Sequence, residues 1–293
     1  MAVTEVLTSS AAIPEEATPA RSSRLWRRLQ LALPVGLLAL VFFACYILPL
    51  VAPIPKPTGG DVLNSLLPSF SPGHLLGTDP NGNDILSRIL YGGRTSLFVA
   101  LSVNVLGLVV GGGLGAIAGQ LGGIVDNIIM RLFDVLIAIP SLALIVAVSL
   151  SLGPGVGNTI LTLAFFSVPA FARISRAETL RLREQPFMVA ARLSGTSIWR
   201  IVVRHLAPNI GPQLMTFAML GMGIVIVIEG ALSFLGLGIR QPAPSWGNMI
   251  FQGQLSLSGT PMLVVWPSVA LFLTVVGFNQ LGEAVRSRWS SGR

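Results

Sequence analysis

Six apolar runs, each long enough to cross a lipid bilayer as a helix, constrain the fold of this chain more than any other feature. A helix needs about 20 predominantly apolar residues to span the hydrocarbon core. The runs occupy residues 31–52, 95–119, 124–152, 157–172 with its flanks, 210–238 and 262–282. The sequence therefore predicts an all-α, polytopic membrane protein with six transmembrane helices.

The charged residues are too few to cover a soluble protein of this length. Only 11% of the 293 residues are charged and 52% are hydrophobic, whereas about 25% charged residues are usual in a soluble domain. The single cysteine, Cys45, excludes an internal disulfide and a CxxC metal or redox site. The net charge of +7 comes from basic residues between the apolar runs. Membrane orientation accounts for that placement, so we expect no nucleic-acid partner.

The placement of the basic residues predicts the orientation in the membrane. With six spans, both termini and the 173–209 loop lie on one side together with 15 of the 19 basic residues. The other side holds Lys56, Arg88, Arg94 and Arg240. Because Lys and Arg concentrate in cytoplasmic loops, both termini and this loop are expected in the cytoplasm.

The predicted organisation has tails and an outer segment around a five-helix core. Residues 1–30 are expected to form a disordered, basic cytoplasmic tail, and residues 284–293 a second cytoplasmic tail. The run at 31–52 is longer than the apolar region of a signal peptide, about 7–15 residues, so it is expected to remain as an anchor. Residues 53–94 are expected outside the membrane, and residues 95–283 form the core.

A dense turn signal lies within this extracytoplasmic segment. Residues 79–84 read Asp-Pro-Asn-Gly-Asn-Asp and favour a tight turn, which leads through an Asn83 cap into a short helix over residues 85–90. A calcium loop needs Gly and Glu at its sixth and twelfth positions, where Asp84 and Leu90 stand. We therefore expect an interfacial helix that frames the second span.

Glycine recurs every four residues along the second predicted span, at Gly107, Gly111, Gly115 and Gly119. This spacing places the four glycines on one stripe of a helix, where a neighbouring helix can approach closely. Part of the run also fits the GxGxxA pattern of dinucleotide-binding proteins, but that pattern requires a preceding strand in a soluble βαβ unit. The glycines are therefore predicted to serve helix packing.

Glu229 lies inside the fifth predicted span. A carboxylate within the membrane is by default a functional hypothesis, such as a proton or cation relay. The other spans hold no second acid, Lys or His at comparable depth, which favours a structural role. In that role Glu229 is bonded to a helix terminus or protonated in the bundle, and the relay stays open as the alternative.

The most informative segment is residues 173–209, which is too polar to span the membrane. It carries seven arginines opposed by two glutamates. Pro186 suits the first turn of a helix, residues 187–194 can continue it, and Gly195 supplies a C-cap. The sequence thus predicts a short helix that ends at a glycine.

A second helix is predicted directly after this glycine. Thr196 can cap it, Ile198 lies on its apolar face, Arg204 lies on its polar face, and Pro208 ends it. Such an amphipathic segment can lie on anionic lipid or dock in the groove of a soluble partner.

Two stretches of this segment carry a recognisable pattern. Residues 189–195 read Val-Ala-Ala-Arg-Leu-Ser-Gly, and residues 204–209 read Arg-His-Leu-Ala-Pro-Asn. Together they resemble the EAA motif of binding-protein-dependent ABC importer permeases. Residues 76–88, 233–238 and 244–249 resemble the peptide and nickel branch of that family, the DppC/OppC-like subunits. The segments occur in family order, and the resemblance covers about residues 25 to 285.

Two positions depart from the family pattern. Val189 stands where the family usually has Glu, although the alanine pair Ala190 and Ala191 and the following Gly195 are retained. Asn83 stands where Arg usually precedes the final Asp of the outer turn. The first departure removes a carboxylate from the surface that would meet an ATPase.

The resemblance implies a type I ABC importer permease fold in the bacterial cytoplasmic (inner) membrane. It implies three kinds of protein partner: a homologous second permease, one or two cytoplasmic ATPase subunits, and an extracytoplasmic solute-binding protein. Membrane lipid surrounds the bundle. The residues implied to couple the chain to the ATPase are Ala190, Ala191, Arg192, Gly195, Ile198, Arg204 and Pro208.

The chain is expected to be non-catalytic and to bind no cofactor or metal. A P-loop needs a lysine that reaches the phosphates, and the only lysine, Lys56, lies between two prolines. ATP and Mg²⁺ are therefore expected on partner ATPase subunits. The implied function is ATP-driven import of di- or oligopeptides, with nickel or another small solute as the alternative. A secondary transporter is a distant alternative, which would need inverted repeats with broken helices near the midplane.

Overall fold

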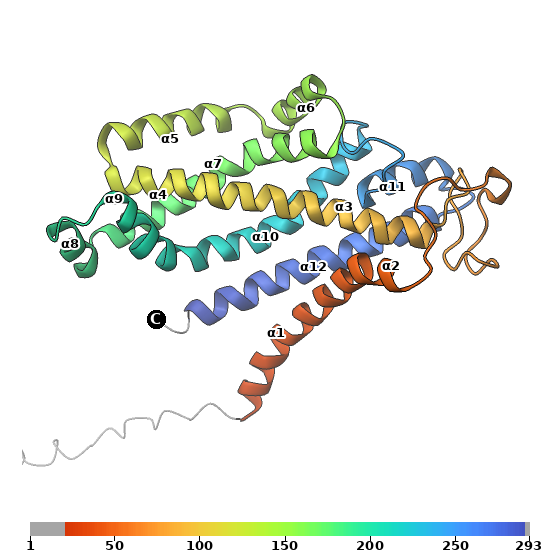
Figure 1. The fold of residues 1–293 in the computed structure, drawn as a ribbon, viewed down its shortest axis with the longest axis horizontal. Helices are drawn as coiled ribbons and strands as arrows, with labels where there is room; N and C mark the ends of the chain where they lie inside the picture. Colours follow the sequence, from red (N-terminus) through yellow and green to blue (C-terminus); the bar gives the residue numbers. More distant parts are fainter. Residues whose placement is uncertain (1–20, 291–293) are drawn as a thin grey trace, which may run out of the picture.

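The computed structural model describes residues 21–290, and describes side chains over residues 31–288. Apart from two isolated β-bridges, every regular element in this range is a helix. Figure 1 shows an elongated bundle with residues 53–84 at one end and the two short helices α8 and α9 at the other. The main helices are α1 (Arg21–Phe42), α2 (Leu48–Val51), α3 (Ile85–Leu106), α4 (Gly112–Leu121), α5 (Gly123–Ala138), α6 (Ser141–Leu152), α7 (Val156–Arg183), α8 (Pro186–Leu193), α9 (Ile198–Arg200), α10 (Ala207–Phe234), α11 (Trp246–Gly253) and α12 (Met262–Ser290).

Three π-helical turns join neighbouring helices without ending them. They are Phe43–Ile47 between α1 and α2, Gly107–Gly111 between α3 and α4, and Ile201–Leu206 between α9 and α10. Two short 3₁₀ helices, Val62–Asn64 and Gln254–Ser256, complete the described elements. The α-helical segments on either side of each π turn therefore form one continuous rod.

Five helices in the described range are long and apolar enough to cross a membrane: Leu31–Val51, Ile85–Leu121, Val156–Arg183, Ile198–Phe234 and Met262–Arg288. The run predicted as an unbroken span over 124–152 is instead the pair α5 and α6, bent by 90°. Ile139, between the two helices, has extended backbone angles, as a residue that precedes a proline prefers, and Pro140 follows it. The described residues thus contain five spans, or six if this bent pair counts as one.

Both ends of the membrane bundle are more helical than the sequence indicates. α1 begins at Arg21, so the last ten residues of the predicted disordered tail at 1–30 are helical, and α12 extends to Ser290 through most of the predicted tail at 284–293. Neither extension contains a Gly or Pro that would end a helix. The predicted tail over 1–20 and residues 291–293 lie outside the described residues.

The short interfacial helix predicted over residues 85–90 is the beginning of a much longer one. The helix runs from Ile85 to Leu121 through the π turn at Gly107–Gly111. Ile85, Ile89 and Leu90 are buried against the bundle. They therefore belong to the core of the protein and not to a separate interfacial helix.

Asp84, and not Asn83, caps this helix. The Oδ1 atom of Asp84 accepts a hydrogen bond from the backbone N–H of Ser87 at 2.8 Å. The side chain of Asn83 is engaged elsewhere, since its Oδ1 accepts from the N–H of Gly60 at 2.9 Å and its Nδ2 donates to Asp79. The Asn83 cap predicted from the sequence is therefore wrong, because tertiary contacts recruit that amide into the turn.

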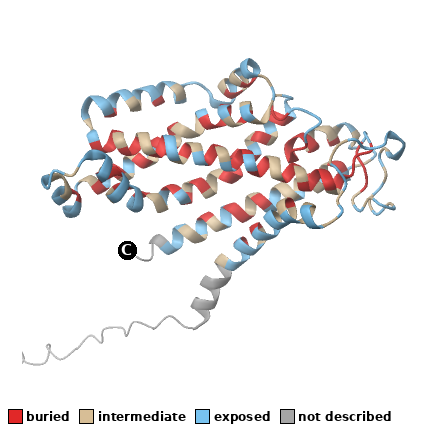
Figure 2. Cartoon of the chain, in the orientation of Figure 1, coloured by how far each residue is buried: buried red, intermediate tan, exposed pale blue. Residues whose placement is uncertain are grey.

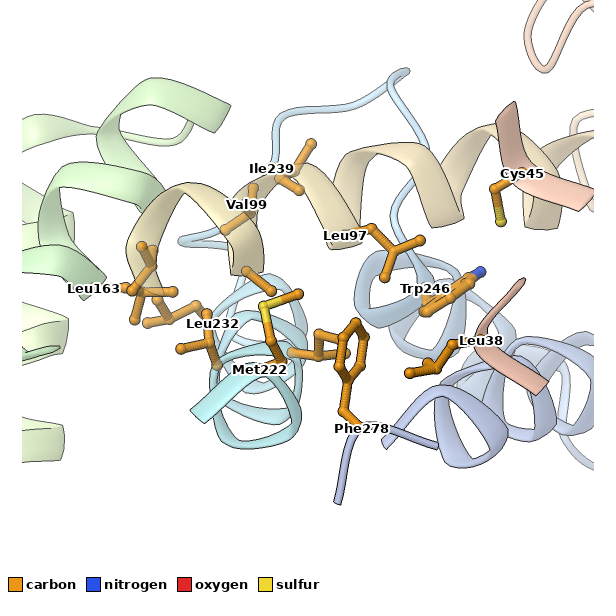
Figure 3. Packing of buried hydrophobic residues seen from close by; sticks show 14 of the residues in the cluster. Leu38, Cys45, Leu97, Val99, Leu163, Met222, Leu232, Ile239, Trp246 and Phe278 are labelled. Carbon is orange, nitrogen blue, oxygen red and sulfur yellow. The ribbon is translucent and has the colours of Figure 1, made fainter. Parts of the chain in front are cut away.

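The main core lies where five helices meet. Figure 3 shows Leu38 of α1, Leu97 of α3, Met222 of α10, Trp246 of α11 and Phe278 of α12 gathered in one buried cluster. A second buried cluster, which joins α4, α7, α8 and α10, extends the core toward the end that carries α8 and α9. Both ends of the bundle are therefore connected by packed side chains.

The four glycines of the predicted stripe lie against α7. A Cβ atom added to Gly115 would lie 2.8 Å from the carbonyl carbon of Ala172, and one added to Gly119 would lie 2.9 Å from the Cβ of Thr179. Gly107 and Gly111 are as close to Phe171 and to the α7 backbone. Only glycine allows α7 to approach at this distance.

We expect Gly115→Val to destabilise the bundle by about 3 kcal/mol, because the added side chain would overlap the α7 backbone. Gly113 offers a matched control in the same helix, since a Cβ atom there meets nothing within 4 Å. The measurement is the thermal unfolding midpoint of each variant in detergent. Equal midpoints for Gly115→Val and Gly113→Val would contradict the packing argument.

Arg94 attaches the first span to the rest of the bundle. Arg94, which the sequence predicts on the extracytoplasmic side, lies in the third turn of α3 and faces the π turn of the first span. Its Nη2 donates to the carbonyl of Tyr46 at 3.1 Å and its Nε to the carbonyl of Cys45. Its guanidinium also lies 4.7 Å from the centroid of the Tyr91 ring. The π turn interrupts the regular hydrogen-bond ladder, and Arg94 satisfies the carbonyls there.

We expect Arg94→Ala to make Cys45 reactive, because the first span would then open locally. Cys45 is 3% exposed in the intact protein and should react slowly with a maleimide. The variant should react at least about tenfold faster, since a contribution of about 1.4 kcal/mol to closure corresponds to that factor. Arg240→Ala, which removes an exposed arginine, is the control. An unchanged rate for Arg94→Ala would show that other contacts hold the span.

Candidate functional site at the α8–α9 end of the bundle

α7 continues well beyond the predicted fourth span. The span predicted over 157–172 is part of a single helix that extends to Arg183. Two ion pairs tie its polar part to α5: Arg176 binds both carboxylate oxygens of Asp126, with an Nη2 to Oδ2 distance of 2.6 Å, and Arg173 binds Asp134 at 2.7 Å. Two of the seven arginines in this segment thus hold α5 in place.

α8 forms where a short helix was predicted over 187–194, but it ends one residue earlier, at Leu193, with Ser194 as its C-cap and Gly195 next. Pro186 occupies the first turn, and Gly195 has a φ of +69°. The N–H of Gly195 donates to the carbonyl of Arg192 at 3.0 Å, and the N–H of Thr196 donates to the carbonyl of Ala191 at 3.2 Å. These two bonds form a Schellman motif, whose left-handed residue is usually glycine.

One buried side chain and one hydrogen bond hold α8 against the bundle. Met188 is fully buried in the cluster that contains Phe171 and Leu206. The Nη2 of Arg192 donates to the carbonyl of Arg183, near the end of α7, at 2.7 Å. α8 is therefore attached along one side, which leaves its opposite side open.

The open side of α8 and α9 carries an apolar patch, which we call the α8–α9 surface. Leu193 is 84% exposed and Trp199 71% exposed, and Figure 2 shows both helices largely as exposed ribbon at the end of the bundle. Val189, which departs from the family pattern, is 38% exposed and adds an apolar side chain. The surface consists of Phe187, Val189, Ala190, Leu193, Ile198 and Trp199.

The other predicted coupling residues differ in how far they are buried. Gly195 and Pro208 are exposed, and so is Arg204. Ala191 and Arg192 are half-buried on the side of α8 nearer the bundle. Ile198, predicted on the apolar face of the second helix, is 46% exposed.

The helix after Gly195 differs from its prediction at both ends. It begins at Ile198 after Ser197, so Thr196 is not its N-cap. Pro208 does not end it, because the rod continues through the π turn Ile201–Leu206 into α10 and reaches Phe234. A proline lacks the N–H that would bond four residues back, and the wide π turn directly before it accommodates that loss.

The carboxylate of Glu229 is fully buried and held by three hydroxyl groups. Its Oε1 accepts from the Oγ atoms of Ser233 at 2.8 Å and Ser245 at 2.9 Å, and its Oε2 accepts from the Oγ of Ser96 at 3.1 Å. These serines belong to α10, to the residue before α11 and to α3. The carboxylate therefore joins three separate elements.

Two of these hydroxyls also cap α11. The Oγ of Ser245 accepts from the N–H of Asn248 at 3.2 Å, and the Oγ of Ser96 accepts from the N–H of Trp246 at 3.3 Å. The first N–H groups of a helix need such acceptors. Glu229 is thus linked to a helix terminus through two serines, which supports the structural interpretation over the relay.

α11 and its serines were not predicted as part of a site. The sequence indicated a motif at 244–249 but no helix there. Serine is a preferred N-cap residue, so Ser245 was a signal for the start of a helix there. The contribution of Ser96 had no such signal, because it lies 133 residues from Glu229.

Comparison with known proteins agrees with the resemblance seen in the sequence. The glutathione transport system permease protein GsiD of Pectobacterium atrosepticum is 38% identical over 269 residues, which cover 89% of this chain and 88% of that protein. The dipeptide transport system permease protein DppC of Alkalihalophilus pseudofirmus is 38% identical over 213 residues, which cover 73% of this chain and 70% of that protein.

The fold also matches a solved structure. A structure of the MetNI methionine ABC transporter in an inward-facing conformation superimposes with a TM-score of 0.54 at 20% identity, over 68% of this chain and 95% of that chain. Residues 111–288, more than half of the chain, match the family described as binding-protein-dependent transport system inner membrane component. This chain is a multi-pass membrane protein that belongs to that family of transport permeases.

Proposed function

We propose that this chain is the non-catalytic, membrane-spanning subunit of an ATP-driven importer in the bacterial cytoplasmic (inner) membrane. The observation that carries the proposal is the α8–α9 surface. It is an exposed apolar patch on a short helix that Met188 anchors and a Schellman motif closes, at one end of a bundle of spans. An exposed apolar patch of this kind, on short helices outside the spans, is typical of a docking site for a protein.

The partner at this surface is a cytoplasmic ATPase subunit, which binds the ATP and Mg²⁺. The small side chains of Ala190 and Ala191 permit close approach of its groove. Because α9 and α10 form one rod, a displacement of the docked helices moves the spans. The assembly then has two conformations, and ATP and solute couple to each other because each of them binds one conformation more tightly than the other.

The remaining partners follow from the family. A homologous second permease completes the pathway, and a solute-binding protein delivers solute on the outer side. In this orientation both termini and the 173–209 segment lie in the cytoplasm, and residues 53–84 and the loop before α11 lie outside. The excess of arginine at the cytoplasmic end supports this orientation.

The solute is a di- or oligopeptide. Relatives that share 38% identity with this chain are named as glutathione and dipeptide permeases, and both solutes are short peptides. The spans offer few ionisable side chains to a solute, which supports selection by the binding protein rather than by a charged site within the membrane.

The test is reconstitution of this chain with its second permease, its ATPase subunits and its binding protein in liposomes. We expect ATP hydrolysis that requires the binding protein and rises with added dipeptide, together with uptake of the labelled peptide. Nickel supplied in place of peptide is the control for the alternative solute. Uptake that proceeds without any ATPase subunit would refute the proposal.

A further inference from the structure

A pocket of about 270 Å³, lined mostly by polar residues and glycines, lies between the 58–62 loop, the 81–83 turn, the loop at Gln241 and α11. Figure 1 shows that residues 53–84 and α11 lie toward the end of the bundle opposite α8 and α9. Four segments that are distant in sequence meet there: the loop near Gly60, the turn at Asn81, the loop at Gln241, and α11 at Gln252. Arg88 of α3 lines the same pocket. Its volume is close to the lower limit of ordinary small-ligand sites, about 300 Å³.

Arg88 is a buried cation whose terminal nitrogens contact only neutral groups. It is 3% exposed. Its Nη1 donates to the carbonyl of Pro57 at 3.2 Å, and its Nη2 donates to Oε1 of Gln252 at 3.4 Å. Each terminal nitrogen of a guanidinium carries two hydrogens. One N–H on each terminal nitrogen therefore has no hydrogen-bond partner among the described residues.

The nearest carboxylate does not use these hydrogens. Asp79 lies at the Nε atom of Arg88, with an Oδ2 distance of 3.3 Å. Its oxygens already accept from the N–H of Asn81 at 2.8 Å, the N–H of Asn83 at 2.9 Å and the side-chain amide of Asn83. Asp79 thus orients Arg88 and stabilises the turn, while the terminal side of the guanidinium faces no anion within the described residues.

The surroundings of the pocket favour a negatively charged ligand. Lys56 directly precedes Pro57, Arg240 directly precedes Gln241, and neither forms an ion pair among the residues with described side chains. The exposed carboxylate of Asp61 caps the 3₁₀ helix at Val62–Asn64 by accepting from Leu63. Next to these segments, two cations, Lys56 and Arg240, thus stand against one exposed carboxylate, that of Asp61.

We propose that this pocket binds a carboxylate group, which the two free terminal N–H groups of Arg88 hold in the bidentate manner typical of arginine. The amide side chains of Asn81 and Gln241, both exposed at the rim, bind the peptide group next to that carboxylate. The carboxylate comes from the C-terminus of a peptide or from an acidic side chain of a docked protein. This site is separate from the ATPase-facing surface and does not depend on it.

Four blocked peptides distinguish these sources on the purified full chain in lipid nanodiscs. Acetyl-Ala-Ala is compared with its C-terminal amide, and acetyl-Ala-Glu-Ala-amide with acetyl-Ala-Gln-Ala-amide, by ligand-observed NMR. We expect the charged member of at least one pair to bind at least about tenfold more tightly than its neutral counterpart. A preference in the first pair assigns the site to a peptide terminus, and a preference in the second assigns it to an acidic side chain. The absence of a preference in both pairs overturns the proposal.

Variants at the rim locate the binding. Gln241→Glu places a like charge beside the carboxylate and should weaken binding about threefold to tenfold, whereas Gln241→Lys should strengthen it. Gln280→Glu, the same change at the far end of α12, should leave affinity unchanged. Arg88→Gln should abolish the preference for the charged peptide.

Arg88 is buried, so its replacement could impair folding; the two Gln241 variants then keep the test valid. Equal affinities for Gln241→Glu, Gln241→Lys and the unmodified chain would also overturn the proposal. None of these measurements requires ATPase or transport, so their failure is separate from a failure of the importer function.

Discussion

Replacing Gly195 by aspartate should lower solute uptake at least about tenfold, equivalent to about 1.4 kcal/mol of lost coupling, while the chain stays inserted and folded. Gly195 has a φ of +69° at the end of α8, in the left-handed region that Gly, and less often Asn and Asp, adopts. An aspartate there places a negative charge beside the carbonyls of Ala191 and Arg192, at the negative end of the helix dipole. This repulsion weakens the cap that fixes the direction of the α8–α9 surface.

The matched control is Gly195→Asn. Asparagine has the same shape as aspartate, tolerates the left-handed conformation and carries no charge. We expect this variant to retain uptake within about twofold of the unmodified protein, a difference of only about 0.4 kcal/mol. The measurements are uptake in proteoliposomes and copurification of the ATPase. Normal uptake and normal copurification in Gly195→Asp would disprove the assigned role of this end of the bundle.

Ala191→Glu complements this pair, because it changes the contact surface without changing the backbone. Ala191 is half-buried on the side of α8 nearer the bundle, where a charged side chain is unfavourable, so the longer glutamate has to turn outward toward the docked partner. We expect the same loss of uptake with the helix cap intact. If Gly195→Asp reduces uptake and Ala191→Glu does not, the helix cap is required for transport and close approach of the partner at Ala191 is not.

Replacing Glu229 by leucine should destabilise the protein by about 3 kcal/mol, roughly 1 kcal/mol for each of the three hydrogen bonds that are lost. The hydroxyls of Ser96, Ser233 and Ser245 would lose their shared acceptor in a site that water does not reach. α11 should then detach before the rest of the bundle unfolds, because two of those hydroxyls cap it.

Glu229→Gln separates the hydrogen bonds from the charge. The amide keeps an oxygen that can accept from the serines, so we expect it to retain more than half of the stability that leucine removes. Glu283→Leu, at an exposed position of α12, is the control and should change the unfolding midpoint little. The measurements are thermal unfolding and hydrogen exchange of residues 246–253. A stability of Glu229→Leu equal to that of the unmodified chain would show that the network contributes nothing.

The spans could be predicted from the sequence because twenty apolar residues in a row have few alternatives to a membrane helix. The bend between α5 and α6 could not be predicted in the same way, since the run from 124 to 152 is apolar on both sides of it. The signal was Pro140, which disfavours a helical conformation for Ile139, although Pro169, Pro212 and Pro267 lie inside helices of the same protein. Hydropathy averaged over a window does not register that local constraint.

The α8–α9 end of the bundle shows what residue type alone can predict. Pro186 and Gly195 have conformational preferences strong enough to place both ends of α8. Pro208 has an equally strong preference, yet it lies inside a continuous helix. The π turn before it depends on tertiary packing of Ile201 and Leu206 and leaves no pattern in the sequence.

The environment of Glu229 was beyond sequence reasoning for a different reason. Its partners lie 133, 4 and 16 residues away, so only the folded chain brings them together. The sequence could show that the carboxylate had no charged partner at its depth. It could not show that serines from three elements would take that place, because serine is common and carries little positional information.

The number of residues in the π turn at Ile201–Leu206 sets the angle by which the helix before it is rotated about the axis of α10. Such a turn holds one residue more than the α-helix it interrupts, and each residue of an α-helix advances the rotation by about 100°. α8 and α9 are therefore turned by about that angle relative to a chain with a regular helix at this place. The direction in which the α8–α9 surface faces therefore depends on the number of residues in this turn and not on any single side chain.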